Sequence, residues 1–313
     1  METLPKSPVL KFPPDTLKVI RKSWDLDGPG RMKEAIDILE EWIKKQQHFV
    51  KKDFPRDYLE ITLICSKGSV ERAKKRLDKV CTLRTFVKSL FGNYDLKNDF
   101  NHLFGEKLTL APLPTLTKDY CRIIVLRFNK LFDAKDFTDM YRALIIYFDY
   151  LRVHDYVNGY IIFNDYKDVN ILEFASKINI LELGHIATTI IEGFGVRIKG
   201  IYLLSTSKLI DAIIAIFKQV LSAKLGNRIY VTKTVEEFHE RVPKEILPKD
   251  YGGNEKNLAE LHDDWIEELS SEEFTKHRNE MNEACTNENL RPVDTFNDQH
   301  LGMPGTFRTL SLD

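Results

Sequence analysis

The stretch of sequence that decides the fold runs from residue 196 to residue 232 and reads VRIKGIYLLSTSKLIDAIIAIFKQVLSAKLGNRIYVT. The apolar run 196–204 predicts a strand, 207–225 predicts a helix with Ser207 as its N-cap, and 228–232 predicts a second strand. A strand, a helix and a strand of these lengths are typical of a crossover unit, in which the two strands run parallel.

The same alternation of strand and helix precedes this unit. The predicted elements are a strand over 121–128, a helix over 136–153, a strand over 159–163 and a long helix over 171–191 that Gly193 and Gly195 close. The segment around Pro112 and Pro114, before the first of these strands, is expected to be a loop. We therefore predict an α/β fold with four strands in a mainly parallel sheet.

The N-terminal third is predicted to be helical. Residues 1–30 are rich in proline and charge and form an arm, and helical spacing of apolar residues then predicts helices over 31–50, 57–65 and 70–91. Ser69 precedes the third of these helices and is expected to cap it, with Arg72 following. These three helices form a small helical subdomain.

The C-terminal part is more polar. Residues 258–269 predict one amphipathic helix, and 270–313 contain few large apolar residues, so we expect that segment to wrap the surface or to be partly mobile. The chain is therefore divided into an N-terminal arm (1–30), a helical subdomain (31–110), a strand-and-helix domain (111–255) and a C-terminal helix and polar tail (256–313).

Charge and cysteine content exclude several classes of protein. The 313 residues hold 46 Lys and Arg against 47 Asp and Glu, so the net charge of −1 excludes binding of nucleic acid or anionic membrane by bulk charge. The four cysteines have no CxxC spacing, which argues against a zinc site or a disulfide framework and fits a reducing cytosol. No secretory signal and no apolar run of about 20 residues is visible, so we expect a cytoplasmic protein.

No catalytic motif emerges from the sequence. GxSxG, GxxxxGK[ST], GxGxxG after a strand and HExxH are all missing, and the eight histidines lie at no metal-ligand spacing. His185, beside Leu183 and Ile186, is expected to be a hydrogen-bonded core or pocket residue. We therefore predict no metal site, no cofactor and no enzyme activity.

The helix predicted over 207–225 is apolar around nearly its whole circumference, especially over LIDAIIAIF at 209–217. An amphipathic surface helix needs only one apolar stripe. Such a helix is fully buried, covers a ligand cavity, or meets a membrane during part of its cycle, and the residues alone leave these three possibilities open.

Four cations flank this helix. Arg197 and Lys199 point the same way because strand side chains alternate, and Lys224 and Arg228 would be one turn apart if the helix continued. Such cations either converge on a phosphorylated headgroup, where arginine offers bidentate contacts, or are scattered solvated charges.

Two further strings carry a resemblance. The first is Ile246-Leu247-Pro248-Lys249-Asp250-Tyr251-Gly252-Gly253, and the second is Gly305-Thr306-Phe307-Arg308-Thr309-Leu310 near the C-terminus. Together with the strand, the apolar helix and the flanking cations, they make the chain resemble the CRAL-TRIO lipid-binding family over about residues 28–270. It is most similar to the branch of alpha-tocopherol transfer protein and cellular retinaldehyde-binding protein, particularly the arthropod members of that branch.

The resemblance implies a lipid-binding domain whose mainly parallel sheet forms the floor of an apolar cavity, closed by a mobile gate helix over 207–221. It also implies a basic cleft beside the gate that binds phosphoinositide headgroups. The matching positions are Lys75, Arg197, Lys199, Lys224 and Arg228. At one usually basic position this chain has Ser66, with Lys67 adjacent, so the headgroup preference stays open.

Spacing and resemblance together predict the walls of the cavity. On the helix over 136–153, Tyr141, Leu144, Ile145 and Phe148 share one face. The other predicted wall residues are Asn164, Ile186, Ile190, Ile201 and Leu203 and, on the inner face of the gate, Ile210, Ile213, Ile214 and Phe217. Ordinary core packing is the alternative interpretation for each of them.

The expected function is binding and transfer, inside the cell, of a small hydrophobic ligand such as a tocopherol, a retinoid, a carotenoid or a similar isoprenoid lipid. Release would take place at phosphoinositide-containing membranes, which the protein would contact transiently. The alternative is a membrane-trafficking adaptor that holds a phospholipid and responds to phosphoinositides.

Overall fold

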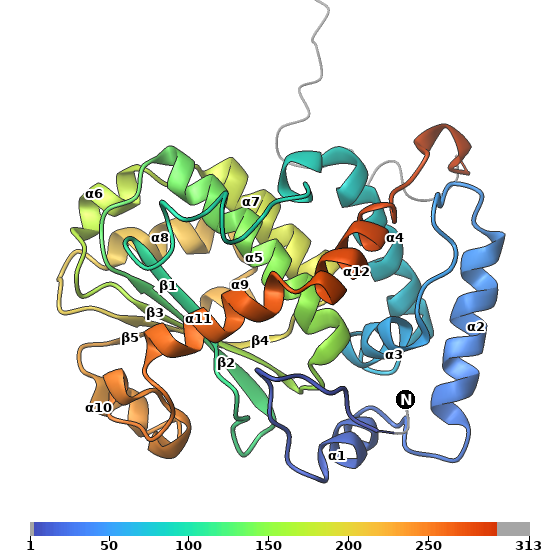
Figure 1. The fold of residues 1–313 in the computed structure, drawn as a ribbon, viewed down its shortest axis with the longest axis horizontal. Helices are drawn as coiled ribbons and strands as arrows, with labels where there is room; N and C mark the ends of the chain where they lie inside the picture. The colour runs from blue at the N-terminus through green and yellow to red at the C-terminus, as the bar shows by residue number, and fades with distance from the viewer. Residues whose placement is uncertain (1–2, 293–313) are drawn as a thin grey trace, which may run out of the picture.

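The structure is a computed structural model, and it describes residues 3–292. A group of helices at one end packs beside a larger unit in which helices cover a sheet (Figure 1). The helical group contains α2 (Arg31–Lys45), α3 (Arg56–Cys65) and α4 (Val70–Phe86), and the shorter α1 (Thr16–Ser23) precedes it.

The larger unit alternates strands and helices. Its strands are β1 (Leu108–Pro112), β2 (Cys121–Phe128), β3 (Gly159–Asp165), β4 (Ile198–Leu204) and β5 (Ile229–Thr232). Its helices are α5 (Ala134–His154), α6 (Ile171–Ser176), α7 (Ile180–Thr188), α8 (Asp211–Val220), α9 (Ala223–Gly226), α10 (Val235–His239), α11 (Leu258–Leu269) and α12 (Glu272–Asn282). One-turn helices lie at Lys88–Leu90, Lys244–Ile246, Lys249–Tyr251 and Glu288–Leu290, and a π-helical turn, η2, lies at Thr189–Gly193.

The five strands lie in their sequence order. Strand β1 pairs antiparallel with β2, and the other three neighbouring pairs are parallel, so the predicted α/β class with a mainly parallel sheet is confirmed. Each parallel connection steps to the next strand. Such connections share a right-handed sense as a rule, which fits the position of α5, α6, α7 and α8 on one face of the sheet (Figure 1).

An aromatic cluster fills the opposite face of the sheet. Phe163 of β3 stacks on Phe238 of α10 with ring centres 4.3 Å apart, and it meets Tyr251 edge-on at 5.2 Å. Tyr202 of β4 also packs on Phe238, at 4.9 Å. Because side chains alternate along a strand, the neighbours of these residues face α5, α7 and α8 instead.

Strand β1 corrects the prediction of a loop at Pro112. All five residues of β1 are buried, so the alternation that marks a half-exposed strand is missing. Pro112 ends the strand at the edge of the sheet, where proline is tolerated. Its carbonyl oxygen accepts a hydrogen bond of 2.8 Å from Nε1 of Trp265 in α11.

The prediction of one continuous helix over 171–191 is wrong. The chain breaks after Ser176, and the side chain of Asn179 accepts hydrogen bonds from the backbone N–H groups of Leu181 and Glu182, which starts α7 as a new helix. After Thr188 the helix widens into the π-helical turn η2.

The helix predicted over 207–225 is also shorter than expected. Helix α8 begins after Ile210, and the hydroxyl of Ser207 accepts a bond from the N–H of Leu209 in the preceding turn instead of capping the helix. The chain leaves the helix at Leu221, and the separate turn α9 ends before Arg228, so no helix joins Lys224 to Arg228.

Other helix predictions agree more closely with the structure. Ser69 caps α4 by accepting from the N–H of Arg72 at 3.3 Å, as predicted. Helix α11 has the predicted bounds, whereas α2 and α4 end earlier than predicted and α12 was missed. The string 305–310 lies outside the described residues.

Buried polar contacts tie the helical group to the sheet unit. Arg84 of α4 forms an ion pair of 2.9 Å with Asp149 of α5. Arg152 of α5 donates from Nη2 to the hydroxyl of Thr62 in α3 at 2.6 Å. A buried pair broken on one side costs about 3–5 kcal/mol, so these contacts fix how the two groups of helices sit together.

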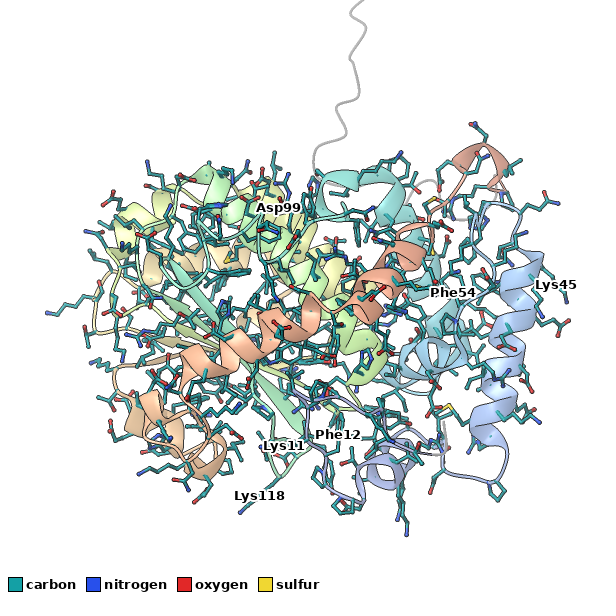
Figure 2. The ribbon with its side chains drawn as sticks, viewed as in Figure 1. Lys11, Phe12, Lys45, Phe54, Asp99 and Lys118 are labelled. Carbon is teal, nitrogen blue, oxygen red and sulfur yellow. The ribbon has the colours of Figure 1, made fainter. Side chains whose placement is uncertain are left out.

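The N-terminal arm lies against the sheet unit. Phe12, labelled in Figure 2, packs under the guanidinium of Arg122 at 5.3 Å from its ring centre. Arg122 in turn forms a fully buried ion pair of 2.6 Å with Asp155. The arm thereby covers a charged pair in the interior.

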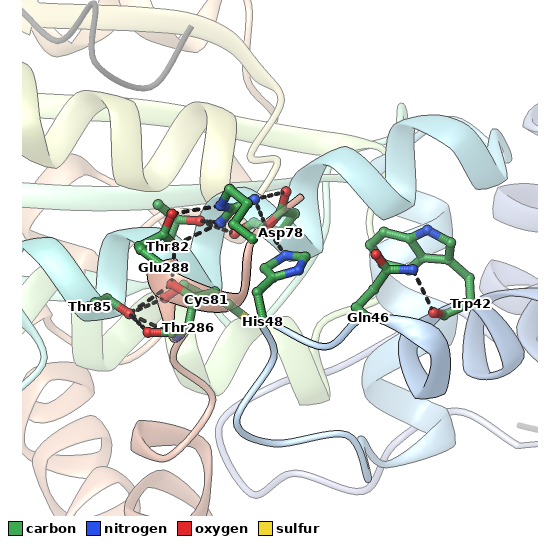
Figure 3. A network of polar contacts seen from close by, with 10 residues as sticks. Trp42, Gln46, His48, Asp78, Cys81, Thr82, Thr85, Thr286 and Glu288 are labelled. Atoms are coloured by element: carbon green, nitrogen blue, oxygen red, sulfur yellow. Dashed lines mark hydrogen bonds and ion pairs between the residues drawn. The ribbon is translucent and has the colours of Figure 1, made fainter. Parts of the chain in front are cut away.

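A second polar network joins the C-terminal segment to α4 (Figure 3). Asp78 accepts bonds from Nε2 of His48 at 3.0 Å and from Nη1 of Arg291 at 2.8 Å. Arg291 also donates to the hydroxyl of Thr82 at 2.7 Å and to Glu288 at 2.6 Å. The last described residues are therefore anchored, whereas the sequence left open whether this segment wraps the surface or is partly mobile.

No helix among residues 3–292 is both long and apolar enough to cross a bilayer.

Candidate functional site

A cavity of about 170 Å³ lies between the sheet and the helices α5, α7 and α8. Its sheet side is lined by Ile124, Leu126, Phe128, Ile162, Asn164, Tyr166, Ile198 and Ile201. Its helical side is lined by Phe137, Met140, Tyr141, Leu144, Phe148, Phe174, Ile178, Leu183, Ile186, Ala187, Ile190, Ile191, Phe217, Val220 and Leu221. None of these described lining residues carries a charge.

Strand alternation explains the sheet side of the cavity. Ile162 and Asn164 of β3 are two residues apart and therefore face the same way. On β4, Ile198 and Ile201 are three residues apart, and both line the cavity because the register with β3 shifts between Tyr160 and Ile161. The sheet side thus supplies a floor that is apolar except for the amide of Asn164 and the hydroxyl of Tyr166.

Helix α8, which we call the gate helix, covers the cavity with one end. Of its ten residues only Ile213 is buried, so it is a surface helix and not a core helix. Phe217 and Val220 in its second half, with Leu221 just after it, contribute to the lining. This helix is apolar around nearly its whole circumference, yet it lies half-exposed beside a cavity and is not buried in the core.

Eight of the thirteen predicted wall residues line this cavity. They are Tyr141, Leu144, Phe148, Asn164, Ile186, Ile190, Ile201 and Phe217. Whether these residues contact a ligand stays a prediction.

The other five predicted wall residues, Ile145, Leu203, Ile210, Ile213 and Ile214, lie outside the lining. Ile145 and Leu203 are almost completely buried and so belong to the core. Ile210 and Ile213 are buried and Ile214 is half-buried in the first part of the gate region, where α8 packs against α6 and α7. The prediction treated the gate as one long helix with a single inner face, and the late start of α8 explains why Ile210, Ile213 and Ile214 lie outside this lining.

Three polar side chains interrupt the apolar lining. Asn164 donates from Nδ2 to the carbonyl oxygen of Tyr202 at 3.4 Å. Tyr141 and Tyr166 lie on α5 and directly after β3, and burial raises the pKa of both hydroxyls. Both phenols are therefore neutral at physiological pH and can donate a hydrogen bond.

A group of cations lies outside the cavity, near the start of β4. We define the basic cluster as Lys67, Arg72, Arg197, Lys199 and Lys224. Desolvation lowers the pKa of Lys67, and the positive charges of the other four members lower it further, which shows that the five share one electrostatic environment. Among the described residues none of the five forms an ion pair with a carboxylate.

The predicted basic residues contribute to this region in different ways. Lys199 and Lys224 are exposed, whereas Arg197 uses its guanidinium to donate to the carbonyl oxygens of Asn158, Ile64 and Val157. Arg228 likewise donates to the carbonyl oxygen of Ile198 at 2.6 Å. The guanidinium groups of both arginines are therefore bonded to backbone carbonyl oxygens, so the two residues contribute positive charge more than free donors.

Lys75 is exposed on α4. Two neighbouring arginines on the same helix, Arg72 and Arg76, were missed by sequence reasoning. Their spacing of four residues on a predicted helix could have indicated that both side chains lie on the same face of that helix.

Arg76 joins the basic cluster to the cavity wall. Its Nη1 donates to the carbonyl oxygens of Ile191 and Glu192 in η2, at 3.0 and 3.4 Å. Gly195, with φ of +75°, permits this approach, because a Cβ at that position would lie 2.4 Å from the same nitrogen. Ile191 lines the cavity, so one arginine touches both regions.

Residues 107–253 match the family model described as CRAL/TRIO domain, and residues 29–100 match the model described as Pinta-like, UBA domain. Residues 107–253 therefore form a domain of the CRAL/TRIO family. The CRAL/TRIO match includes all five strands and the gate helix, and this family binds and transfers lipophilic ligands and is not known as an enzyme family.

Two proteins that are similar to this chain are both named alpha-tocopherol transfer protein-like. The protein from Mus musculus is 25% identical over 259 residues, which cover 80% of this chain and 74% of the relative. The protein from Homo sapiens is 24% identical over 270 residues, which cover 82% of this chain and 78% of the relative. Among solved structures, this chain is similar to the crystal structure of Sfh5. The match covers 80% of this chain and 92% of the Sfh5 chain, with 12% sequence identity and a TM-score of 0.43.

No group of three or more histidine, cysteine, aspartate or glutamate side chains within residues 3–292 is arranged to hold a metal ion.

Proposed function

We propose that this CRAL/TRIO protein carries one uncharged isoprenoid-like lipid in the cavity beneath the gate helix and releases it at membranes that contain phosphoinositides. The observation that carries the proposal is the lining itself, in which no described residue is charged. A charged headgroup buried there would lack a counter-charge, which is strongly unfavourable, whereas hydrocarbon is favoured.

The energy of enclosure explains why release needs a trigger. Removing about 400 Å² of apolar ligand surface from water stabilises the complex by about 10 kcal/mol before ordering costs. Escape into water would therefore be slow. A membrane removes this barrier because its interior receives the ligand and the exposed apolar side chains of the gate region together.

Exposed apolar side chains surround the gate and support this view. Leu172 on α6 is 52% exposed, Leu181 on α7 is 57% exposed, and Leu209 just before α8 is 50% exposed. Both α6 and α7 pack against α8. Apolar groups of this kind are suited to contact with a lipid surface.

The basic cluster would recruit the anionic headgroup. Its cations form no ion pairs among the described residues, and Lys67, Lys199 and Lys224 have exposed side chains. A phosphoinositide bound there would compete for the donors of Arg76 and so loosen η2, which carries Ile190 and Ile191 in the cavity wall. Headgroup binding would then favour the open state.

Transfer of a bound fluorescent retinoid to vesicles tests the proposal. Phosphatidylcholine vesicles with and without phosphatidylinositol bisphosphate serve as acceptors for the wild type and for a Lys67→Ala, Lys199→Ala, Lys224→Ala variant. The control variant carries Lys33→Ala, Lys45→Ala and Lys276→Ala, which remove three exposed lysines elsewhere, Lys45 at the outer edge of α2 (Figure 2).

We expect phosphoinositide to raise the rate of transfer from the wild type and from the control. In the first variant this stimulation should be smaller by at least about tenfold, since each cation contributes about 1 kcal/mol at an anionic surface. Equal stimulation of all three proteins would remove the basic cluster from the mechanism. A tightly held phospholipid and no affinity for the retinoid would favour the adaptor function instead.

A further inference from the structure

The cavity contains two buried hydroxyl groups that the fold does not use. Tyr141 is 2% exposed and Tyr166 is 3% exposed, and neither hydroxyl has a hydrogen-bond partner among the described residues. Two other buried tyrosines are matched, since Tyr147 donates to the carbonyl oxygen of Leu110 and Tyr251 donates to Asp165, whereas the buried hydroxyl of Tyr58, outside the cavity, also lacks a partner. Buried polar groups without partners are rare in proteins, so the pair in the cavity requires an explanation.

Asn164 lies in the same lining and is 5% exposed. Its Nδ2 donates to Tyr202, which leaves the side-chain oxygen without a partner among residues 3–292. Tyr166 follows β3 directly and stacks on Phe128 with ring centres 4.8 Å apart, so the position of its ring is fixed. Tyr141 and Tyr166 line the same cavity, and the negative charge that Tyr141 would carry if ionised raises the pKa of Tyr166, after the larger effect of burial.

We propose that Tyr141, Tyr166 and Asn164 form the binding site for a single uncharged oxygen at one end of the ligand, a hydroxyl or a carbonyl. Two O–H donors and one amide oxygen match either group, since a carbonyl accepts from the phenols and a hydroxyl also donates to the amide. The rest of the lining offers only hydrocarbon contacts and directs the tail of the ligand toward α7 and the gate helix.

The same chemistry selects against a carboxylate. A carboxylate at this site would meet phenols but no cation, because the basic cluster lies outside the cavity lining. Its desolvation would be uncompensated, so the acid form of a lipid should bind more weakly than its alcohol. This inference rests on the proposed function, because it assumes that the cavity holds a lipid.

Three probes with one branched C20 skeleton separate head from tail: phytol, phytane and phytanate. Binding is measured by competition with a fluorescent lipid for the wild type, Tyr141→Phe and Tyr166→Phe. Tyr230→Phe is the matched control, because Tyr230 stacks on Tyr202 on the other face of the sheet.

We expect the wild type to bind phytol about tenfold more tightly than phytane and phytanate least tightly. Each cavity variant should lose about fivefold to tenfold of its affinity for phytol and none for phytane, while Tyr230→Phe should match the wild type. The unchanged affinity for phytane shows at the same time that each variant is folded. Phytol and phytane bound equally, or phytol bound equally by all four proteins, would overturn the head-group site and leave the lipid-binding function intact. Failure of all three probes would overturn the proposed function itself.

Discussion

Nη1 of Arg76 lies 3.0 Å from the carbonyl oxygen of Ile191, and this hydrogen bond connects a helix of the N-terminal helical group to the wall of the cavity. Burial lowers the pKa of Arg76 most, and the positive charges of Arg152, Arg197 and Arg72 also lower it. The guanidinium therefore sits beside like charges while it holds η2. An anion that relieves this repulsion would act on the cavity wall through one side chain.

Replacing Arg76 should uncouple the cavity from the basic cluster. We expect Arg76→Met to raise the rate of ligand release to vesicles without phosphoinositide by about tenfold, because it removes charge-assisted hydrogen bonds to the η2 carbonyls. Arg72→Met removes a charge from the same helix but leaves those bonds, so it should lower only the phosphoinositide effect. Wild-type basal release and full stimulation in Arg76→Met would contradict the coupling.

A side chain at Gly195 should have the same consequence. Gly195 and Gly30 both have φ of +75°, but only Gly195 would bring its Cβ against Arg76, whereas the Cβ at Gly30 would meet nothing within 4 Å. Alanine at either position costs about 1–2 kcal/mol of backbone strain. Gly195→Ala should lose about 1 kcal/mol more than Gly30→Ala and should also release ligand faster, because Arg76 can avoid the clash only by leaving the carbonyls. Urea unfolding and the transfer assay measure both effects, and identical behaviour of the two variants would argue against this role of Gly195.

Filling the cavity should prevent binding without unfolding the protein. Ala187 lines the cavity on α7, and Ala187→Trp places an indole in a space of about 170 Å³. We expect at least a tenfold loss of affinity for any bound lipid, with a change in stability of about 1–3 kcal/mol. Ala215→Trp on the exposed side of the gate helix is the control and should bind normally. Tight binding by Ala187→Trp would show that the ligand lies elsewhere.

The network around Asp78 predicts a pH dependence of stability. Burial alone would raise the pKa of Asp78, but hydrogen bonds from His48 and Arg291 lower it below its ordinary value. A lowered pKa in the folded state means that the ionised group stabilises the protein above the unfolded pKa of about 3.9, and that this contribution is lost as the pH falls through the folded pKa. Asp78→Asn should therefore reduce the free energy of unfolding by about 3–5 kcal/mol at pH 7 and by less at pH 3, as followed by urea denaturation. A deficit that is the same at both pH values would mean that the charge of Asp78 contributes nothing.

The sequence predicts the elements whose pattern is local. The parallel strands, the Ser69 cap and α11 follow from apolar runs and capping residues. Strand β1 was missed because its residues are buried on both faces and end in proline, so neither alternation nor composition marks it. The break before α7 depends on the side chain of Asn179, which accepts hydrogen bonds from the first backbone N–H groups of a new helix and so ends the possibility of one continuous helix.

The same limit applies to the site. Tyr141, Leu144 and Phe148 were predicted to line the cavity because their helical spacing puts them on one face, and the structure places them there. Tyr166 and Arg76 act through contacts with chain segments far away in sequence, and no local pattern identifies such contacts. The start of the gate helix likewise depends on how residues 207–210 pack, which shifted its lining residues toward Phe217 and Leu221.

Capture of lipid from a complex mixture tests the central claim most directly. The protein is incubated with vesicles made from a total cellular lipid extract, recovered without detergent and examined by native mass spectrometry, followed by extraction and phosphorus analysis of the bound lipid. The account predicts one neutral lipid per chain, free of phosphorus, and a Tyr141→Phe variant that captures less of the oxygen-bearing species. A bound phospholipid or fatty acid, or a chain that captures no lipid at all, would contradict it.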